Sequence, residues 1–376
     1  MEKPERLLSL DVFRGITIAG MILVNNPGTW DSIYPPLRHA EWNGCTPTDL
    51  IFPFFLFIVG VAIPFALGKR VERGDNHKQI VLQIIRRSTI LFLLGLIIHA
   101  FPFGLLNHNF DLSTLRIPGV LQRIAIVYLI TSILFLKLNY KAQVYIGAVL
   151  LIVYWLLMTL VPVPGVGYSN LEQTTNLAAW IDRTLFGGHL WSQSKVWDPE
   201  GILSTLPAIT TSIMGVITGL WLKTNKDKIT KTVWLFVMGS ICMTMGYVWN
   251  GWFPINKSIW TSSYVLYTGG LALLFLGFCY WFIDVRQTKW WTKPFLVYGS
   301  NPITVYFLSE LVGKLLYMII VPSGNEKFPL NTFLFNNFFL SRMEPINASL
   351  LWAIVYVLIW LGLMWILYAK KIFIKV

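Results

Sequence analysis

Apolar residues fill long windows of this chain, and short polar segments separate them. The windows cover residues 14–30, 49–68, 88–106, 117–136, 143–163, 202–222, 232–250, 261–283, 295–321 and 348–369. Each window reaches the roughly 17 residues or more that a helix needs to cross the hydrocarbon core of a bilayer. The pattern therefore predicts an all-α polytopic membrane protein with about ten transmembrane helices.

The polar segments between the windows are short, so we expect a single transmembrane domain over residues 1–376. The longest connection, 164–201, is rich in glycine, tryptophan and polar residues. Segment 331–341 is too short to span a bilayer and contains three asparagines. We interpret it as a re-entrant or interfacial piece within a loop.

Composition supports a membrane protein, and charge orients it. Hydrophobic residues form 55% of the chain and charged residues only 13%, with a mean hydropathy of +0.60, whereas soluble domains carry about 25% charged residues. With both termini in the cytoplasm, 21 of the 30 Lys and Arg residues fall in cytoplasmic segments and seven in outer ones. This asymmetry is the one that the positive-inside rule describes.

The net charge of +12 is explained by basic loops beside anionic lipid headgroups, so we expect no nucleic-acid partner. Cys45, Cys242 and Cys279 show no metal-ligand spacing, and we expect neither a metal site nor a disulfide framework.

Polar residues gather around His39, just before the second apolar window. Glu41, Trp42, Asn43 and Asp49 follow within ten residues, and Asp49 is placed to cap the second helix. A histidine beside a tryptophan can be an ordinary interfacial residue. With a carboxylate to orient its ring, it can also act as a general base.

The first window has polar residues at both ends. Asp11 and Arg14 precede it on the cytoplasmic side, where they can pair with each other or present Arg14 to an anionic ligand. Asn25 and Asn26 lie near its outer end. Either amide can cap the helix, or it can hold an imidazole or an oxyanion.

Other windows carry charges that a lipid environment does not explain. Arg123 lies inside the fourth window, where a charge usually faces a cavity or a partner. Glu310 and Lys314 are four residues apart in the ninth window, and we expect them to pair. Asn301 precedes a proline that should break the same helix near its cytoplasmic end.

Further polar residues approach the membrane from the outer side. Asp198 and Glu200 lead into the sixth window, and Lys257 leads into the eighth. His99 and His108 flank the outer end of the third window and are second-rank candidates beside His39. Carboxylates on this side could steer an ammonium group toward the site.

Several of these segments resemble one known family. LSLDVFRG, ILVNN, RHAEWNGCTPTDLIFPFFLFIVG, GVLQRIA, DPEGILSTLPAI, PINKSIWTSS and GSNPITVY, between residues 7 and 310, are similar to the heparan-α-glucosaminide N-acetyltransferase family of transmembrane acyltransferases. The specific part is HAEWNG followed by TDLIFPFFLF. The chain looks like a compact bacterial member that lacks the N-terminal luminal domain of the animal enzymes.

The resemblance implies an enzyme that takes acetyl-CoA from the cytosol and acetylates a glucosamine amine on the opposite side of the membrane. It places the essential histidine on His39 and the accompanying asparagine on Asn25. Asn26 stays an alternative, because three more residues separate the pair here than in the animal pattern. Without the luminal domain, a small amino sugar or cell-wall fragment is expected as the acceptor, in a bacterial inner membrane.

The implied roles fit the physical chemistry of the residues. Arg14, Arg123 and Asn301 are candidates for binding acetyl-CoA, and Trp42 offers a ring against which a sugar can stack. His39 acts either as a base in direct transfer, which we favour, or as an acetylated intermediate. The rival function is an amino-sugar transporter, which would place its polar residues near the midplane. Aromatic outer helix faces are compatible with a homodimer.

Overall fold

The computed structural model describes residues 7–105, 111–323 and 326–374 of this protein. Its α-helices are α1 (Leu8–Asn25), α2 (Ile51–Ala66), α3 (Gly68–Glu72), α4 (His77–Ala100), α5 (Val120–Lys137), α6 (Tyr140–Leu160), α7 (Leu177–Phe186), α8 (Ile202–Lys223), α9 (Lys228–Trp249), α10 (Ser262–Tyr280), α11 (Lys293–Ser300), α12 (Pro302–Met318), α13 (Leu330–Phe335) and α14 (Pro345–Ala369). Strands β1 (Ile320–Ser323) and β2 (Glu326–Pro329) form an antiparallel hairpin, and π-helices extend α10 over Trp281–Val285 and α13 over Asn336–Leu340.

The predicted fold class is confirmed. Within the described residues, nine helices are long and apolar enough to cross a membrane. The ninth apolar window, 295–321, instead forms two helices, α11 and α12, which meet at Asn301. Pro302 follows, has no backbone N–H to donate and restricts the residue before it, so the break falls where the sequence predicted it.

Two helices begin earlier than hydropathy predicts. α1 begins at Leu8 and not near residue 14, and α4 begins at His77 and not near residue 88. In α1 the charges of Asp11 and Arg14 form an ion pair, so they fit within the first turns of the helix. The first turns of α4 contain basic residues, and the side chain of Asn76 caps the helix just before His77.

Glycines bring several helices close together. A Cβ added at Gly60 of α2 would lie 2.1 Å from the Ser212 carbonyl oxygen of α8, and one at Gly15 of α1 would lie 1.8 Å from the Phe295 carbonyl oxygen of α11. Side chains larger than hydrogen would therefore force these backbones apart, which is why small residues mark helix contacts in membranes. α2–α8 and α1–α11 are accordingly among the most extensive helix contacts.

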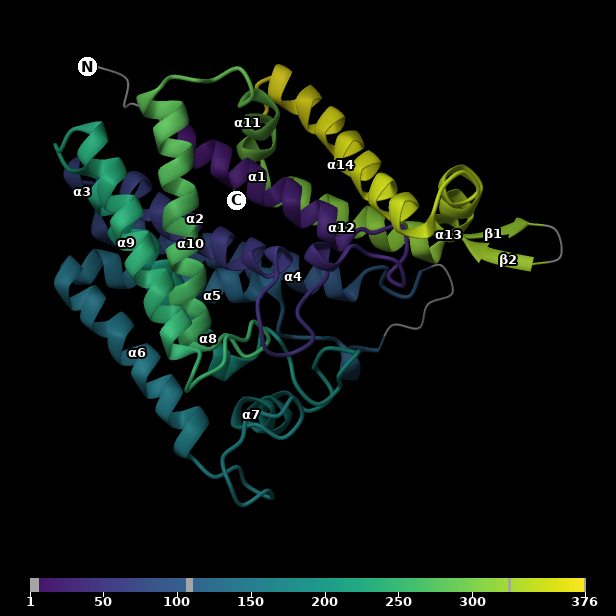
Figure 1. The fold of residues 1–376 in the computed structure, drawn as a ribbon, viewed down its shortest axis with the longest axis horizontal. Coiled ribbons are helices and arrows are strands. Elements are labelled where there is room, and N and C mark those ends of the chain that lie inside the picture. The colour runs from purple at the N-terminus through teal and green to yellow at the C-terminus, as the bar shows by residue number, and fades with distance from the viewer. Residues whose placement is uncertain (1–6, 106–110, 324–325, 375–376) are drawn as a thin grey trace.

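The helices run broadly from the upper left to the lower right of Figure 1, and their connections separate to the two ends. α11 lies near the top of the view and α3 at the left, whereas α7 lies at the bottom and the β1–β2 hairpin at the right. α7 forms within the long connection 164–201. At its end of the bundle, backbone hydrogen bonds join Gly44 to Ile255 and Ile117 to His189. Loops distant in sequence therefore converge there.

Candidate active site

His39 and Asp49 form a close pair at the N-terminus of α2. The Nδ1 atom of His39 lies 2.6 Å from Oδ1 of Asp49. The other carboxylate oxygen, Oδ2, accepts hydrogen bonds from the backbone N–H groups of Ala40 and Thr46, both at 3.0 Å, and from the Thr46 hydroxyl at 3.1 Å. Asp49 is buried, whereas 49% of the His39 side chain is exposed. The loop that carries His39 therefore holds its own carboxylate partner in place.

The capping turn explains this local geometry. Thr46 and Asp49 form a capping box at the 3-10 turn Pro47–Leu50, from which α2 continues. Asp49 therefore takes part in a cap before α2, as predicted, but as the third residue of the turn, and Thr46 is the N-cap residue. In a capping box an acidic residue satisfies a backbone N–H that the helix leaves unpaired. Here the same carboxylate also binds the imidazole.

Lys257 joins the pair from the loop between α9 and α10. Its Nζ atom lies 3.0 Å from Nδ1 and 3.3 Å from Nε2 of His39, and 3.6 Å from Oδ1 of Asp49. Next to it in sequence, the Asn256 amide donates to the side-chain oxygen of Asn43 at 3.2 Å. Burial lowers the pKa of the Lys257 ammonium, and the charge of Asp49 opposes that shift.

The His39–Asp49 pair can accept a proton at Nε2 of His39. A carboxylate at Nδ1 accepts a hydrogen bond from the protonated Nδ1, which leaves the lone pair of Nε2 to take a proton. The neighbouring Cys45 is not a competing nucleophile, because burial, with a contribution from Asp49, raises the pKa of its thiol to about 12.

His39, Asp49 and Lys257 line a cavity of about 850 Å³. Its volume falls within the range that small-molecule sites occupy. The other polar groups of its wall come from α1, α4, α12 and the neighbouring loops, and they include Asn25, Glu41, His99, Asp111, Arg116, Glu200, Glu310 and Lys314. The aromatic side chains of Trp191, Trp197 and Tyr306 also line it.

The two candidate asparagines at the end of α1 differ in where their side chains lie. Asn25 lines the cavity, and its Nδ2 atom donates to Oε1 of Glu310 at 3.0 Å. Asn26 is not among the residues of the cavity wall, and its Nδ2 atom donates to the backbone of its own helix, to the Ile22 carbonyl at 2.9 Å. The geometry therefore favours Asn25 for the site.

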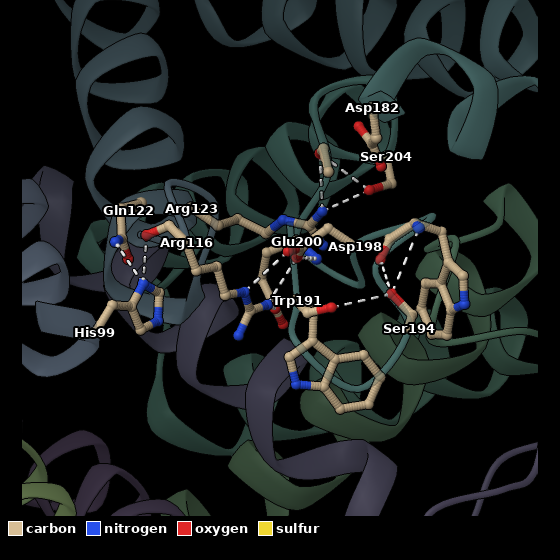
Figure 2. A network of polar contacts seen from close by, with 12 residues as sticks. His99, Arg116, Gln122, Arg123, Asp182, Trp191, Ser194, Asp198, Glu200 and Ser204 are labelled. Carbon is tan, nitrogen blue, oxygen red and sulfur yellow. Dashed lines mark hydrogen bonds and ion pairs between the residues drawn. The ribbon is translucent and has the colours of Figure 1, made fainter. Parts of the chain in front are cut away.

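Arg116 neutralises the two carboxylates that precede α8 (Figure 2). Its guanidinium contacts Asp198 through two hydrogen bonds, at 2.8 and 2.7 Å, and Glu200 through one at 2.6 Å. Burial alone would favour the neutral guanidine, but the two carboxylates outweigh it and raise the pKa of Arg116. Next to this network, Nδ1 of His99 lies 2.8 Å from the Arg116 carbonyl oxygen. The other second-rank candidate, His108, lies outside the described residues.

Besides Asp198, Arg14 and Asn301, three predicted residues lie outside the wall of this cavity. Trp42 packs edge-on against Trp197 and donates to the Leu171 carbonyl, and Asn43 holds Asn256. Arg123 is buried, donates to the Gly201 carbonyl at 3.1 Å and lies over the ring of Trp260. Their contacts support the loops around the site.

A second, smaller cavity of about 80 Å³ lies toward the other end of the helices. Arg14 and Arg87 line it, together with apolar side chains of α2, α4 and α5. Arg14 also pairs with Asp11 and donates to the Gly299 carbonyl at 3.0 Å. Asn301 is next to Pro302 of this cavity, but its side chain binds the backbone of Ile372 and Ile374.

The ion pair predicted between Glu310 and Lys314 is not formed among the described residues: the two charges are close enough to attract each other, but each side chain hydrogen-bonds to another group. Glu310 accepts from Asn25, and Lys314 donates to the Ile98 carbonyl near the C-terminus of α4, where the helix dipole favours a cation. Tyr306, Glu310, Lys314 and Met318 all line the larger cavity. Their spacing of four residues along one helix face was the signal that could have placed them there.

Comparisons with known proteins agree with the resemblance in the sequence. Heparan-alpha-glucosaminide N-acetyltransferase of Homo sapiens is 31% identical over 99% of this chain and 60% of the human protein, and the Mus musculus protein of that name is 30% identical with the same coverage. The chain thus spans about 60% of the length of these curated relatives. The family described as "Domain of unknown function (DUF5009)" matches residues 6–239, more than half of the chain, and the protein therefore belongs to that family.

Proposed function

We propose that this protein transfers the acetyl group of acetyl-CoA to the amine of an amino sugar at the His39 site. The observation that carries the proposal is the contact of 2.6 Å between His39 and Asp49 in a cavity that Asn25 also lines. It is supported by similarity over 99% of the chain to proteins named heparan-alpha-glucosaminide N-acetyltransferase.

The reaction needs one base and one group to stabilise an oxyanion. The ammonium group of the sugar first releases one proton to solvent, and the neutral amine then attacks the thioester carbon. The C–N bond forms, the C–S bond breaks, and the second proton lost by nitrogen passes through Nε2 of His39 to the departing thiolate. Asp49 keeps the proton of the imidazole on Nδ1 and stabilises the imidazolium that forms in between. Asn25, whose amide has a second N–H besides the one that Glu310 accepts, and the ammonium of Lys257 are the donors for the oxyanion.

Direct transfer fits the size of the cavity. Its volume of about 850 Å³ leaves room for a sugar and the end of a thioester arm together. The alternative, an acetylated His39, would need only one substrate at a time. The two schemes differ in whether acetyl-CoA is consumed before the sugar binds.

The two cavities offer a route for acetyl-CoA. Both are lined by α1, α2, α4, α5 and α12, at successive positions along each helix. On α1, Arg14 lines the small cavity and Asn25 the large one; 11 residues separate them, about 16 Å at 1.5 Å per residue. A pantetheine arm threaded between these helices would bring its thioester to His39, with its phosphates near Arg14 and Arg87.

We assign the basic end of the bundle to the cytoplasm and the His39 end to the outer side of a cell membrane, the inner membrane in a bacterium. The positive-inside asymmetry of the loops supports this orientation. A small amino sugar then enters from outside and stacks on Trp191 or Trp197 of the cavity wall. His39 precedes α2 in a loop, away from the midplane position that a transporter would favour.

The test is incubation of the purified protein with labelled acetyl-CoA and glucosamine. Label should appear in the sugar, and His39→Ala should lower the rate by about 100-fold or more while CoA binding is retained. His77→Ala, an exposed histidine at the start of α4, is the matched control and should leave the rate unchanged. An active His39→Ala variant would remove His39 from the mechanism. Rapid quenching with labelled acetyl-CoA alone should leave His39 unlabelled if transfer is direct.

A further inference from the structure

The carboxylates around the large cavity differ in how many hydrogen bonds they already accept. Asp49 accepts from His39, Ala40 and Thr46, and Glu200 is bound to Arg116. Asp111, at the rim, accepts from the backbone and hydroxyl of Ser113 at 2.8 and 2.7 Å. These three groups are therefore poorly available to a cationic ligand.

Glu41 also lines the cavity, but its side chain is exposed, so water solvates its charge and a bound cation gains little there. Glu310 differs from these four carboxylates. It lines the cavity from α12 and is only partly exposed. Among the described residues, the hydrogen bond that its carboxylate accepts is the one from Asn25, at 3.0 Å, through Oε1. The nearby cation Lys314 donates its own hydrogen bond to the Ile98 carbonyl. Oε2 of Glu310 is thus available to the cavity.

A carboxylate in this position is stabilised by a cation that the ligand supplies. Removing a carboxylate from bulk water is costly unless it is paired and hydrogen-bonded, and one neutral amide compensates only part of that cost. A protonated primary amine would provide both a charge and N–H donors, and charge-assisted hydrogen bonds of this kind are stronger than neutral ones.

We infer that Oε2 of Glu310 is the ammonium subsite of the cavity and makes the protein select an amino sugar over a neutral sugar. The inference rests on the proposed function and names the group that recognises its acceptor. The Asn25–Glu310 hydrogen bond places this subsite beside the asparagine assigned to the reaction. Asp198 and Glu200, which the sequence offered for the same task, are occupied by Arg116.

The experiment is equilibrium binding of labelled glucosamine and labelled glucose to the purified full-length protein in nanodiscs with CoA present. Glucose carries a hydroxyl where glucosamine carries its ammonium group. Glu310→Gln keeps an oxygen that can accept from Asn25 and removes only the charge. It should weaken glucosamine binding by about 10-fold or more and leave glucose and CoA binding within about two-fold. Glu172→Gln, an exposed carboxylate in the connection 164–201, is the matched control and should change none of them.

A second variant should change the affinity for glucosamine in the opposite direction. Lys314→Met removes a cation that competes with the ligand for Glu310 and should tighten glucosamine binding by about three-fold. Unchanged glucosamine binding in Glu310→Gln, or a wild-type protein that binds glucose as tightly as glucosamine, would overturn the inference. A wild-type protein that binds glucosamine selectively but never acetylates it would overturn the proposed function and leave the subsite standing.

Discussion

Replacing Asp49 with asparagine would test whether this carboxylate sets the tautomer of His39. Three donors, the N–H groups of Ala40 and Thr46 and the Thr46 hydroxyl, converge on Oδ2 of Asp49. In the variant they would orient the amide oxygen toward themselves and turn its NH₂ group toward Nδ1 of His39. Nδ1 would then become an acceptor, the ring proton would move to Nε2, and the base would be lost.

The expected loss can be bounded. A positioned general base contributes about 10²–10⁴-fold to a rate, and forcing the wrong tautomer costs about 10⁴ in a serine protease. We therefore expect Asp49→Asn to lower the rate of acetyl transfer by about 10²–10⁴-fold, with little change in CoA binding. The double variant with His39→Ala should be no slower than His39→Ala alone, because both changes remove one function.

The assay is steady-state transfer of labelled acetyl groups to glucosamine, with melting temperatures of each variant measured in the same detergent. Asp31→Asn serves as the control, since Asp31 lies exposed in the same segment and contacts only Thr29 and, through its backbone carbonyl, Arg38 among the described residues. A folded Asp49→Asn protein that turns over within about three-fold of wild type would refute the tautomer argument, because that difference is under 1 kcal/mol.

Three further predictions concern stability. Arg116→Ala leaves the buried Asp198 without its cation, so we expect a loss of about 3–5 kcal/mol, seen as a lower melting temperature; an unchanged melting temperature would contradict the pairing. Gly60→Ala places a methyl group 2.1 Å from the Ser212 carbonyl oxygen and should cost about 1–3 kcal/mol, measured as earlier aggregation on heating and size exclusion; a normal profile would contradict the close approach. Burial raises the pKa of Asp182 from 3.8 to about 7, so the folded protein retains a proton that the unfolded chain releases. The free energy of unfolding should then fall as pH rises from about 4 to 7. Asp182→Asn should reduce the difference between melting temperatures measured at pH 5 and pH 8; an equal difference in the variant and the wild type would contradict the raised pKa.

Hydropathy was sufficient for the fold class because the lipid environment demands long apolar helices. It could not place helix ends where charges pair locally. Asp11 and Arg14 read as a polar flank but lie within α1, since each neutralises the other. Asn301 and Pro302 were read correctly because a proline restricts the backbone whatever surrounds it.

Site residues close together in sequence were predictable, and those brought together by packing were not. His39 and Asp49 are ten residues apart and share one loop, so their contact was within reach of the sequence. The Asn25–Glu310 contact joins positions 285 residues apart, and no periodicity reveals which helices meet. For the same reason the sequence did not predict the ion pair between Arg116 and Asp198. Because of this pair, Asp198 is not a free carboxylate.

The capping box at Thr46 and Asp49 also limits how this protein can move. The carboxylate that begins α2 is the one that aligns His39, so any tilt or unwinding of that helix end would displace the imidazole. α2 is further fixed to α8 by the close approach at Gly60. An opening that admits a sugar or releases a product must therefore leave this corner rigid and hinge elsewhere. The break between α11 and α12 at Asn301, beside Pro302 in the wall of the small cavity, is one place where a helix is already interrupted.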